Sequence, residues 1–186
     1  MIQINEKNLE EIKNKLNTIR SDLNKIEYLE SIFKKDFSID IKRFALTNLI
    51  SLYEKNMMYE KAARVLSTKA RFDTTFREKI EDYIESAKFF CKVGKIDDAE
   101  EMFSRASREA NEQQRKELFF KKKQMYLEFA EYLEKTGKRS SSLRFYEILI
   151  KIPYLTEEEK TKIKEKLSKT YKLLGRFREA ETISKL

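Results

Sequence analysis

Glycine and proline are almost absent from this chain, and that scarcity limits its possible folds more than any other feature. Its 186 residues include three glycines and one proline. A many-stranded fold needs glycine and proline in its tight turns, so a β-rich architecture is not expected. Apolar residues make up 40% of the chain, enough for a continuous core. The composition therefore predicts an all-α protein.

The three glycines mark regularly spaced turns between helical patterns. Gly94, Gly137 and Gly175 follow one another at intervals of 43 and 38 residues. A step of 37 residues back from Gly94 reaches Met57, in a similar turn without glycine. There we expect Asn56 to adopt the left-handed conformation that glycine otherwise supplies at a helix end. The spacing predicts about four helical hairpins.

The segments on either side of these turns repeat an apolar pattern. Before each turn lies an apolar stripe, and after it a small residue is followed four positions later by a larger one, which lets paired helices approach closely. These pairs are Ala62 with Leu66, Ala99 with Phe103, Ser142 with Tyr146, and Ala180 with Ser184. Capping boxes are predicted at Thr75 with Glu78, Asp97 with Glu100, and Thr156 with Glu159.

The N-terminal part of the chain, residues 1–36, differs from the repeats in residues 37–186, and we expect two domains with these bounds. Between residues 8 and 33 apolar residues follow a heptad pattern, which predicts one long amphipathic helix. The pattern comprises Leu9, Ile12, Leu16, Ile19, Leu23, Ile26 and Phe33, with Glu30 interrupting it. Such a helix either caps its own chain or forms a homodimeric coiled coil.

The repeats resemble the tetratricopeptide-repeat (TPR) superfamily. The segments that carry the resemblance are Leu49-Ile50-Ser51-Leu52-Tyr53 with Tyr59-Glu60-Lys61-Ala62, then Lys92-Val93-Gly94-Lys95-Ile96-Asp97-Asp98-Ala99-Glu100, and Tyr171-Lys172-Leu173-Leu174-Gly175-Arg176-Phe177-Arg178-Glu179-Ala180. Turn spacings of 37 to 43 residues exceed the usual ~34, so the chain is most similar to longer-period variants, such as SNAP-like or proteasome-lid-like repeats. The resemblance implies a right-handed α-solenoid that acts as a protein-binding scaffold or adaptor.

The resemblance also implies that the first helix of each hairpin lines a concave groove for a peptide or a partner helix. Helix phase places eight residues of this chain on that surface. They are Ser51, Glu54, Ile84, Lys88, Leu127, Glu131, Lys169 and Lys172. The family's carboxylate clamp for chaperone tails is absent, because its positions hold Thr47, Ser51, Glu85, Gln124 and Glu128.

The positive charge of the chain is concentrated near its C-terminus. Residues 111–186 hold nineteen basic and twelve acidic groups, a net +7 out of +8 for the whole chain. A basic face is predicted there, comprising Lys160, Lys162, Lys164, Lys166, Lys169, Arg176 and Arg178. Such a face is either a solvated surface or an anion-binding one, so the alternative function is that of an RNA- or ribosome-associated protein.

Several classes of chemistry are not expected. The chain has no histidine and a single cysteine, Cys91, which excludes a Ser-His-Asp relay and a cysteine–histidine zinc cage. No glycine-rich phosphate loop is present. We therefore expect no enzymatic activity, metal or cofactor. The sequence shows no apolar run of membrane-spanning length and no signal peptide, so a cytoplasmic protein is expected.

Overall fold

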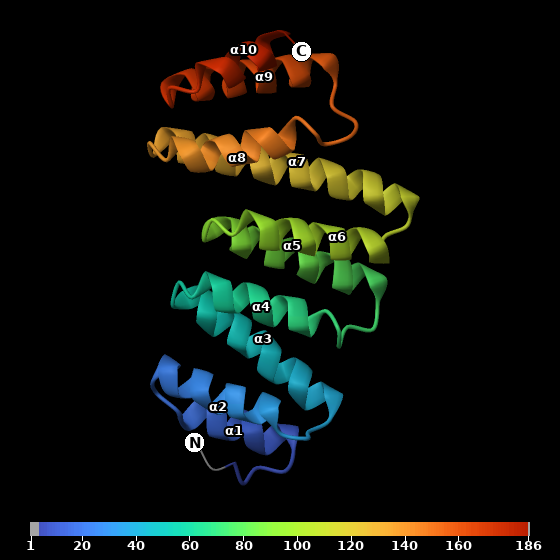
Figure 1. Cartoon of the computed structure of the whole chain (residues 1–186). Helices are drawn as coiled ribbons and strands as arrows, with labels where there is room; N and C mark the ends of the chain where they lie inside the picture. The colour runs from blue at the N-terminus through green and yellow to red at the C-terminus, as the bar shows by residue number, and fades with distance from the viewer. Residues whose placement is uncertain (1–3, 186) are drawn as a thin grey trace. The chain divides into compact units, whose positions relative to one another are not determined.

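The computed structural model describes residues 4–185, which form ten α-helices and contain no strand. The predicted all-α class is confirmed. The chain divides at Ala110–Asn111 into two compact units, here called unit 1 and unit 2 (Figure 1). Unit 1 contains α1 (Leu9–Thr18), α2 (Asp22–Lys34), α3 (Ile39–Lys55), α4 (Tyr59–Lys69), α5 (Phe76–Lys92) and α6 (Ile96–Glu109). Unit 2 contains α7 (Glu112–Lys135), α8 (Arg139–Leu149), α9 (Glu157–Leu173) and α10 (Phe177–Lys185).

Four antiparallel helix pairs share one type of turn. The pairs are α3–α4, α5–α6, α7–α8 and α9–α10. At each turn one residue has positive φ: 57° at Met57, 74° at Gly94, 78° at Gly137 and 74° at Gly175. In every case the next N–H donates to the carbonyl five residues back; at Gly94, for example, Lys95 N lies 3.0 Å from Phe90 O. These are the hydrogen bonds of a Schellman motif, which closes a helix end.

The first of these turns corrects one expectation. Asn56 has φ −91°, so it is not the left-handed residue predicted from its amide side chain. Met57 takes that conformation instead, with φ 57°. The reason is the register of the motif, which places the left-handed residue at the position equivalent to Gly94. The Asn56 side chain is used differently, since its Nδ2 donates to Leu52 O at 2.7 Å.

The N-terminal segment also differs from expectation. The single helix predicted over residues 8–33 is wrong, because the structure has two helices with a break from Ile19 to Ser21. Ser21 is extended, at φ −82° and ψ 131°, and begins α2 as its N-cap. After the break α2 buries Tyr28 and Leu29, whereas Leu23 of the heptad pattern is 60% exposed.

Helix α2 packs against α3 of the same chain. The hydroxyl of Tyr53 donates to the Glu30 carboxylate, and Lys55 Nζ lies 2.7 Å from Asp22 Oδ2. These contacts explain why Glu30 interrupts the heptad, since it serves as an acceptor for α3.

Three expectations from the sequence stay predictions: homodimerisation through residues 8–33, the domain boundary near residue 36 and the handedness of the array.

Capping fixes the starts of several helices. The predicted boxes at Thr75 with Glu78 and at Thr156 with Glu159 are confirmed at α5 and α9. The box predicted at Asp97 is wrong, because α6 begins two residues earlier than that box requires, at Ile96 with Lys95 as its N-cap. The Schellman turn at Gly94 leaves only Lys95 before α6, and a lysine side chain cannot accept a capping hydrogen bond. A further box, with Asn111 capping α7 through Gln114, was not predicted.

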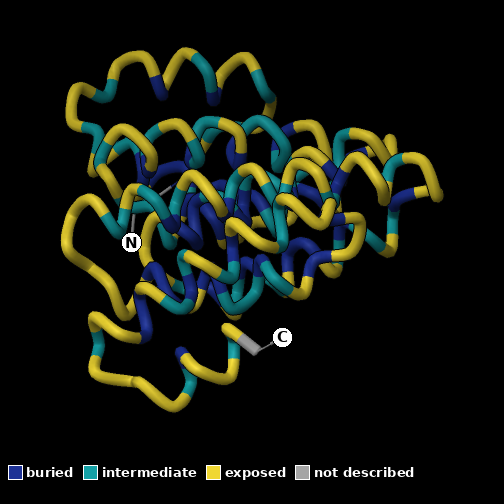
Figure 2. Tube along the Cα trace, turned by 90° about the horizontal axis from the view of Figure 1, so that it is seen from above, coloured by how far each residue is buried: buried dark blue, intermediate teal, exposed yellow. Residues whose placement is uncertain are grey.

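The core of each unit lies between its packed helices. Buried positions recur along one side of the helices and exposed positions along the other (Figure 2). The small residues after each turn, Ala62, Ala99, Ser142 and Ala180, are all buried. Their larger partners Leu66, Phe103 and Tyr146 are buried as well, whereas Ser184 is exposed. The predicted small-and-large pairing is therefore confirmed in three hairpins and half met in the last.

Unit 1 contains a buried cluster of charged side chains between successive hairpins. Lys69 Nζ of α4 lies 2.7 Å from Asp82 Oδ2 of α5 and 3.2 Å from Asp73 Oδ1. Arg43 of α3 lies 3.5 Å from the same Asp73 oxygen. The Asp73 side chain is fully buried, so its charge depends on these cations for compensation. The cluster thus joins α3, α4 and α5.

Among residues 4–185, no helix combines the length and apolarity needed to cross a membrane.

Candidate functional site

A cleft of about 560 Å³ lies in unit 2 among α7, α8 and α9. The capping boxes at Asn111 and Thr156 fix where α7 and α9 begin, so they set which side chains of these helices face each other. Pro153 and the residues after it separate α8 from α9, and Tyr154 in this connection has φ 66°. The cleft combines an apolar floor with a charged rim, and both are built from within unit 2.

The floor is apolar. Tyr146 and Leu149 of α8 are fully buried, and Leu155 and Ile163 are almost so, with exposed fractions of 8% and 6%. Leu127 of α7 lines the same cleft but is 38% exposed. A large apolar side chain open to solvent in a concave site is the kind of group that a partner's side chain buries. Leu127 is therefore the accessible apolar contact of the cleft.

Two ion pairs connect α7 and α9 on the rim. Lys123 Nζ lies 2.6 Å from Glu159 Oε1, and Lys166 Nζ lies 3.0 Å from Glu134 Oε2. The Tyr146 hydroxyl of α8 donates to the same Glu134 oxygen at 3.1 Å. Lys123 and Lys166 thus already have acceptors within unit 2.

The carboxylates of these pairs are held in the charged form. The hydrogen bond from Lys123 and another from the Thr156 backbone lower the pKa of Glu159. At Glu134 burial favours the neutral form, but the bonds from Lys166 and Tyr146 outweigh it and lower the pKa. Burial, together with the Glu134 charge, raises the pKa of Tyr146. The rim therefore keeps its charges at neutral pH.

Three of the eight residues predicted for the groove line this cleft: Leu127, Glu131 and Lys169. Lys172 lines a second cavity of about 580 Å³ between α9 and α10, where Lys169 also contributes. Lys169 and Glu165 belong to the linings of both cavities, so the two are adjacent along α9.

The other four predicted residues belong to unit 1 and lie on α3 and α5. Ser51 is exposed and its hydroxyl donates to Thr47 O at 3.4 Å. Glu54 lies 3.8 Å from Lys92, which connects the ends of α3 and α5. Lys88 pairs with Glu85 at 3.1 Å, and Ile84 is half-buried.

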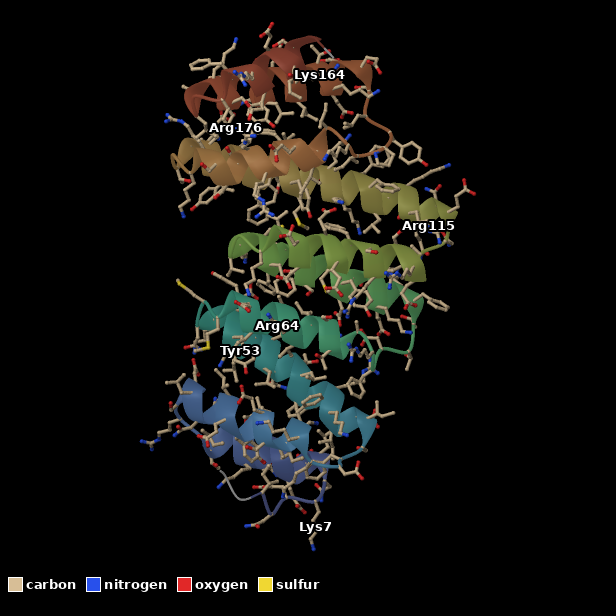
Figure 3. The ribbon with its side chains drawn as sticks, in the orientation of Figure 1. Lys7, Tyr53, Arg64, Arg115, Lys164 and Arg176 are labelled. Atoms are coloured by element: carbon tan, nitrogen blue, oxygen red, sulfur yellow. The ribbon has the colours of Figure 1, made fainter. Side chains whose placement is uncertain are left out.

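The predicted basic face is partly neutralised by ion pairs. Lys160 pairs with Glu157 at 2.7 Å, Lys162 with Glu158 at 2.6 Å and Lys166 with Glu134. Arg176 pairs with Glu179 at 2.8 Å and lies over the Tyr171 ring, 4.7 Å from its centroid. Within the described part of unit 2, Lys164, Lys169 and Arg178 have no ion pair. Figure 3 labels Lys164 on α9 and Arg176 at the turn before α10.

Sequence reasoning missed several lining residues, among them Lys123, Leu149, Leu155 and Glu159. Glu159 was predicted only as a cap, and Lys123 only as part of the basic C-terminal charge. Their sequence separation is 36 residues, and no local pattern indicates that they meet. Among residues 4–185, no cluster of three or more cysteine, aspartate or glutamate side chains is arranged to hold a metal.

No protein-family model and no curated protein sequence matches the chain. Three solved structures are similar at low identity. A putative kinesin light chain with nearly identical TPR-like repeats from Podosopora anserina is 14% identical, with a TM-score of 0.40, over 95% of this chain and 89% of that one. BtubC (BKLC) from P. vanneervenii is 15% identical, with a TM-score of 0.38, over 94% and 72%. MamA AMB-1 is 14% identical, with a TM-score of 0.38, over 95% and 90%. At TM-scores below 0.5 these likenesses do not bear on the site.

Proposed function

We propose that the chain is a non-catalytic scaffold or adaptor, and that it binds a peptide or a helix of a partner protein in the cleft of unit 2. The observation that carries the proposal is the 38% exposed Leu127 in a cleft of about 560 Å³. An apolar contact surrounded by charged groups resembles the centre and rim of a protein interface.

The lining of the cleft also favours binding over chemistry. Its polar side chains are lysine, glutamate, glutamine and tyrosine. The Tyr146 hydroxyl is already bonded to Glu134, and Lys123 and Lys166 to carboxylates. The hydroxyl and two of the amines of the lining are thus engaged in contacts within unit 2, which favours a binding role over acid–base or covalent catalysis.

The four predicted residues of unit 1 belong to the proposal as a second contact surface. Ser51 and Glu54 are exposed on α3, and Ile84 and Lys88 are half-buried on α5. This second surface is proposed for unit 1 by itself. Alanine at Ile84 is expected to weaken partner binding without removing it.

The experiment is photo-crosslinking from the cleft itself. A photoreactive p-benzoylphenylalanine replaces Leu127 in the full chain, and the control carries it at Lys138, which is exposed and outside both cavities. After exposure to a lysate of the source cells, we expect a discrete protein adduct from position 127 alone, unchanged by ribonuclease. Equal adducts from both positions would refute the proposal. An adduct removed by ribonuclease would instead support the RNA- or ribosome-associated alternative.

A further inference from the structure

The charge of the chain changes sharply at the boundary between the two units. Residues 1–110 carry 21 basic and 20 acidic groups, whereas residues 111–186 carry 19 and 12. The structural boundary falls at Ala110–Asn111. The net charge is therefore +1 for unit 1 and +7 for unit 2, so the unit that holds the cleft is also the one that attracts anions.

The excess positive charge near the cleft lies on the exposed side of α9. Lys169 lines both cavities of unit 2, and Lys164 and Lys172 line the second one. None of these three lysines has an ion pair within the described residues of the unit. In contrast, the lysines that connect α9 to α7, Lys123 and Lys166, are paired.

A fourth lysine on this side is only weakly held. Lys162 lies 2.6 Å from Glu158, but the two side chains are 70% and 77% exposed. Exposed pairs of this kind contribute little to stability, so Lys162 can exchange its partner for an acidic group of a ligand. The accessible edge of the cleft therefore combines the apolar Leu127 with Lys162 and Lys169, beside the carboxylates of Glu131 and Glu165, and Lys172 lies in the adjoining second cavity.

The same residues distinguish between two classes of acidic partner. Arginine, which supplies planar bidentate contacts to phosphates and bases, is absent from the lining of both cavities. The only aromatic side chain in these linings is Tyr146, which is fully buried and cannot stack on a base. An apolar contact beside unpaired lysines instead matches a protein segment that carries carboxylates.

We propose that the occupant of the cleft is an acidic amphipathic segment of a partner protein, with an apolar side chain on Leu127 and carboxylates facing Lys162, Lys169 and Lys172. The inference rests on the proposed function and adds the chemistry of the partner. A helical segment suits the site, because one face of a helix can present an apolar residue while acidic residues flank it.

The test is selection from a displayed library of random 16-residue peptides. The full wild-type chain is used to select binding peptides. Peptides that also bind a Leu127→Gln variant are then discarded, because they bind elsewhere on the chain. Glutamine keeps a similar helix propensity, and circular dichroism checks that the variant folds. We expect the wild-type-specific peptides to be rich in Asp and Glu, with apolar residues spaced three or four apart.

The two possible failures of this selection are distinguishable. Wild-type-specific peptides that are neutral or basic would overturn the proposal that the partner segment is acidic, but not the proposal that a segment docks at the cleft. A selection with no wild-type-specific peptide would overturn both.

The best selected peptide then tests the lysines by fluorescence anisotropy. The double variant Lys162→Glu and Lys169→Glu is expected to bind it at least about 10-fold more weakly, the loss that two opposed charges produce. The matched control, Lys138→Glu with Lys151→Glu, makes the same charge change outside both cavities and is expected to change the Kd less than about twofold. Equal weakening by both double variants would show only general attraction and contradict the proposal.

Discussion

Lys166 of α9 and Glu134 of α7 form an ion pair of 3.0 Å, and the Tyr146 hydroxyl of α8 donates to the same carboxylate oxygen. One carboxylate thus joins the three helices that build the cleft. Its side chain is 18% exposed, so water replaces these bonds poorly. The position of α9 beside α7, and with it the form of the cleft, depends on this contact.

We expect Glu134→Gln to lower the free energy of unfolding by about 1 kcal/mol, because charge-assisted hydrogen bonds are replaced by weaker neutral ones. Urea denaturation measures the change. Glu158→Gln is the matched control, since it removes an i,i+4 pair whose two side chains are mostly exposed, and no measurable change is expected there. Equal losses in the two variants would contradict this role of Glu134.

The turn at Met57 predicts a stabilising substitution. Met57 is the one left-handed residue among the four Schellman turns that is not glycine, and a side chain there is strained. Met57→Gly is expected to raise the free energy of unfolding by about 0.5 kcal/mol, because relief of this strain exceeds the entropic cost of glycine. Thermal and urea unfolding measure it.

Gly94→Ala is the opposite change at the equivalent position. Gly94 has φ 74°, and an added Cβ would meet no atom within 4 Å. The cost of alanine is therefore one of backbone conformation alone, and we expect a loss of about 1 kcal/mol. If Met57→Gly and Gly94→Ala changed the free energy of unfolding in the same direction, the two positions would not share one type of turn.

The buried cluster of unit 1 predicts an unusual pH dependence. Burial raises the pKa of Asp82 to about 6, against the opposing effect of Lys69, and the neighbouring Asp73 raises it further. The folded state therefore binds a proton at Asp82 more readily than the unfolded state, whose pKa is about 4. Through this group the free energy of unfolding rises as the pH falls from about 7 to 4.

The difference in free energy of unfolding between the wild type and Asp82→Asn isolates this effect. We expect the free energy of unfolding of the wild type, minus that of the variant, to increase as the pH is lowered from 7 to 5. The contribution of Glu134 to stability has the opposite pH dependence. Its pKa is lowered in the folded state, so the stability that it contributes is lost as the pH falls through the acidic range. A pH-independent difference for Asp82→Asn would exclude the raised pKa.

The hairpins were predictable from sequence because their signals are local. Glycine spacing located the turns, and small residues such as Ala62 and Ala99 marked where paired helices meet. At the first turn the left-handed residue is Met57 and not the predicted Asn56. The register of the motif therefore determined this position, and the conformational preference of asparagine did not. The break at Ser21 was missed for a different reason: the heptad pattern runs through it, and the burial of Tyr28 and Leu29 depends on tertiary packing.

The cleft was predictable only in part. Helix phase identified Leu127, Glu131 and Lys169, because it predicted which side of α7 and α9 faces the groove. The contribution of α8 and of Leu155 depends on how far α9 stands from the α7–α8 pair, and no sequence pattern determines that distance.

The central claim, that a protein segment docks on the cleft of unit 2, is tested most directly by methyl NMR of the full chain. A peptide selected on the wild-type chain is titrated into protein labelled at Ile, Leu and Val methyl groups. We predict saturable shifts at Leu127, Leu155 and Ile163, with Leu66 and Ile80 of unit 1 unchanged. Saturable shifts confined to other methyl groups, with Leu127 unmoved, would contradict the claim.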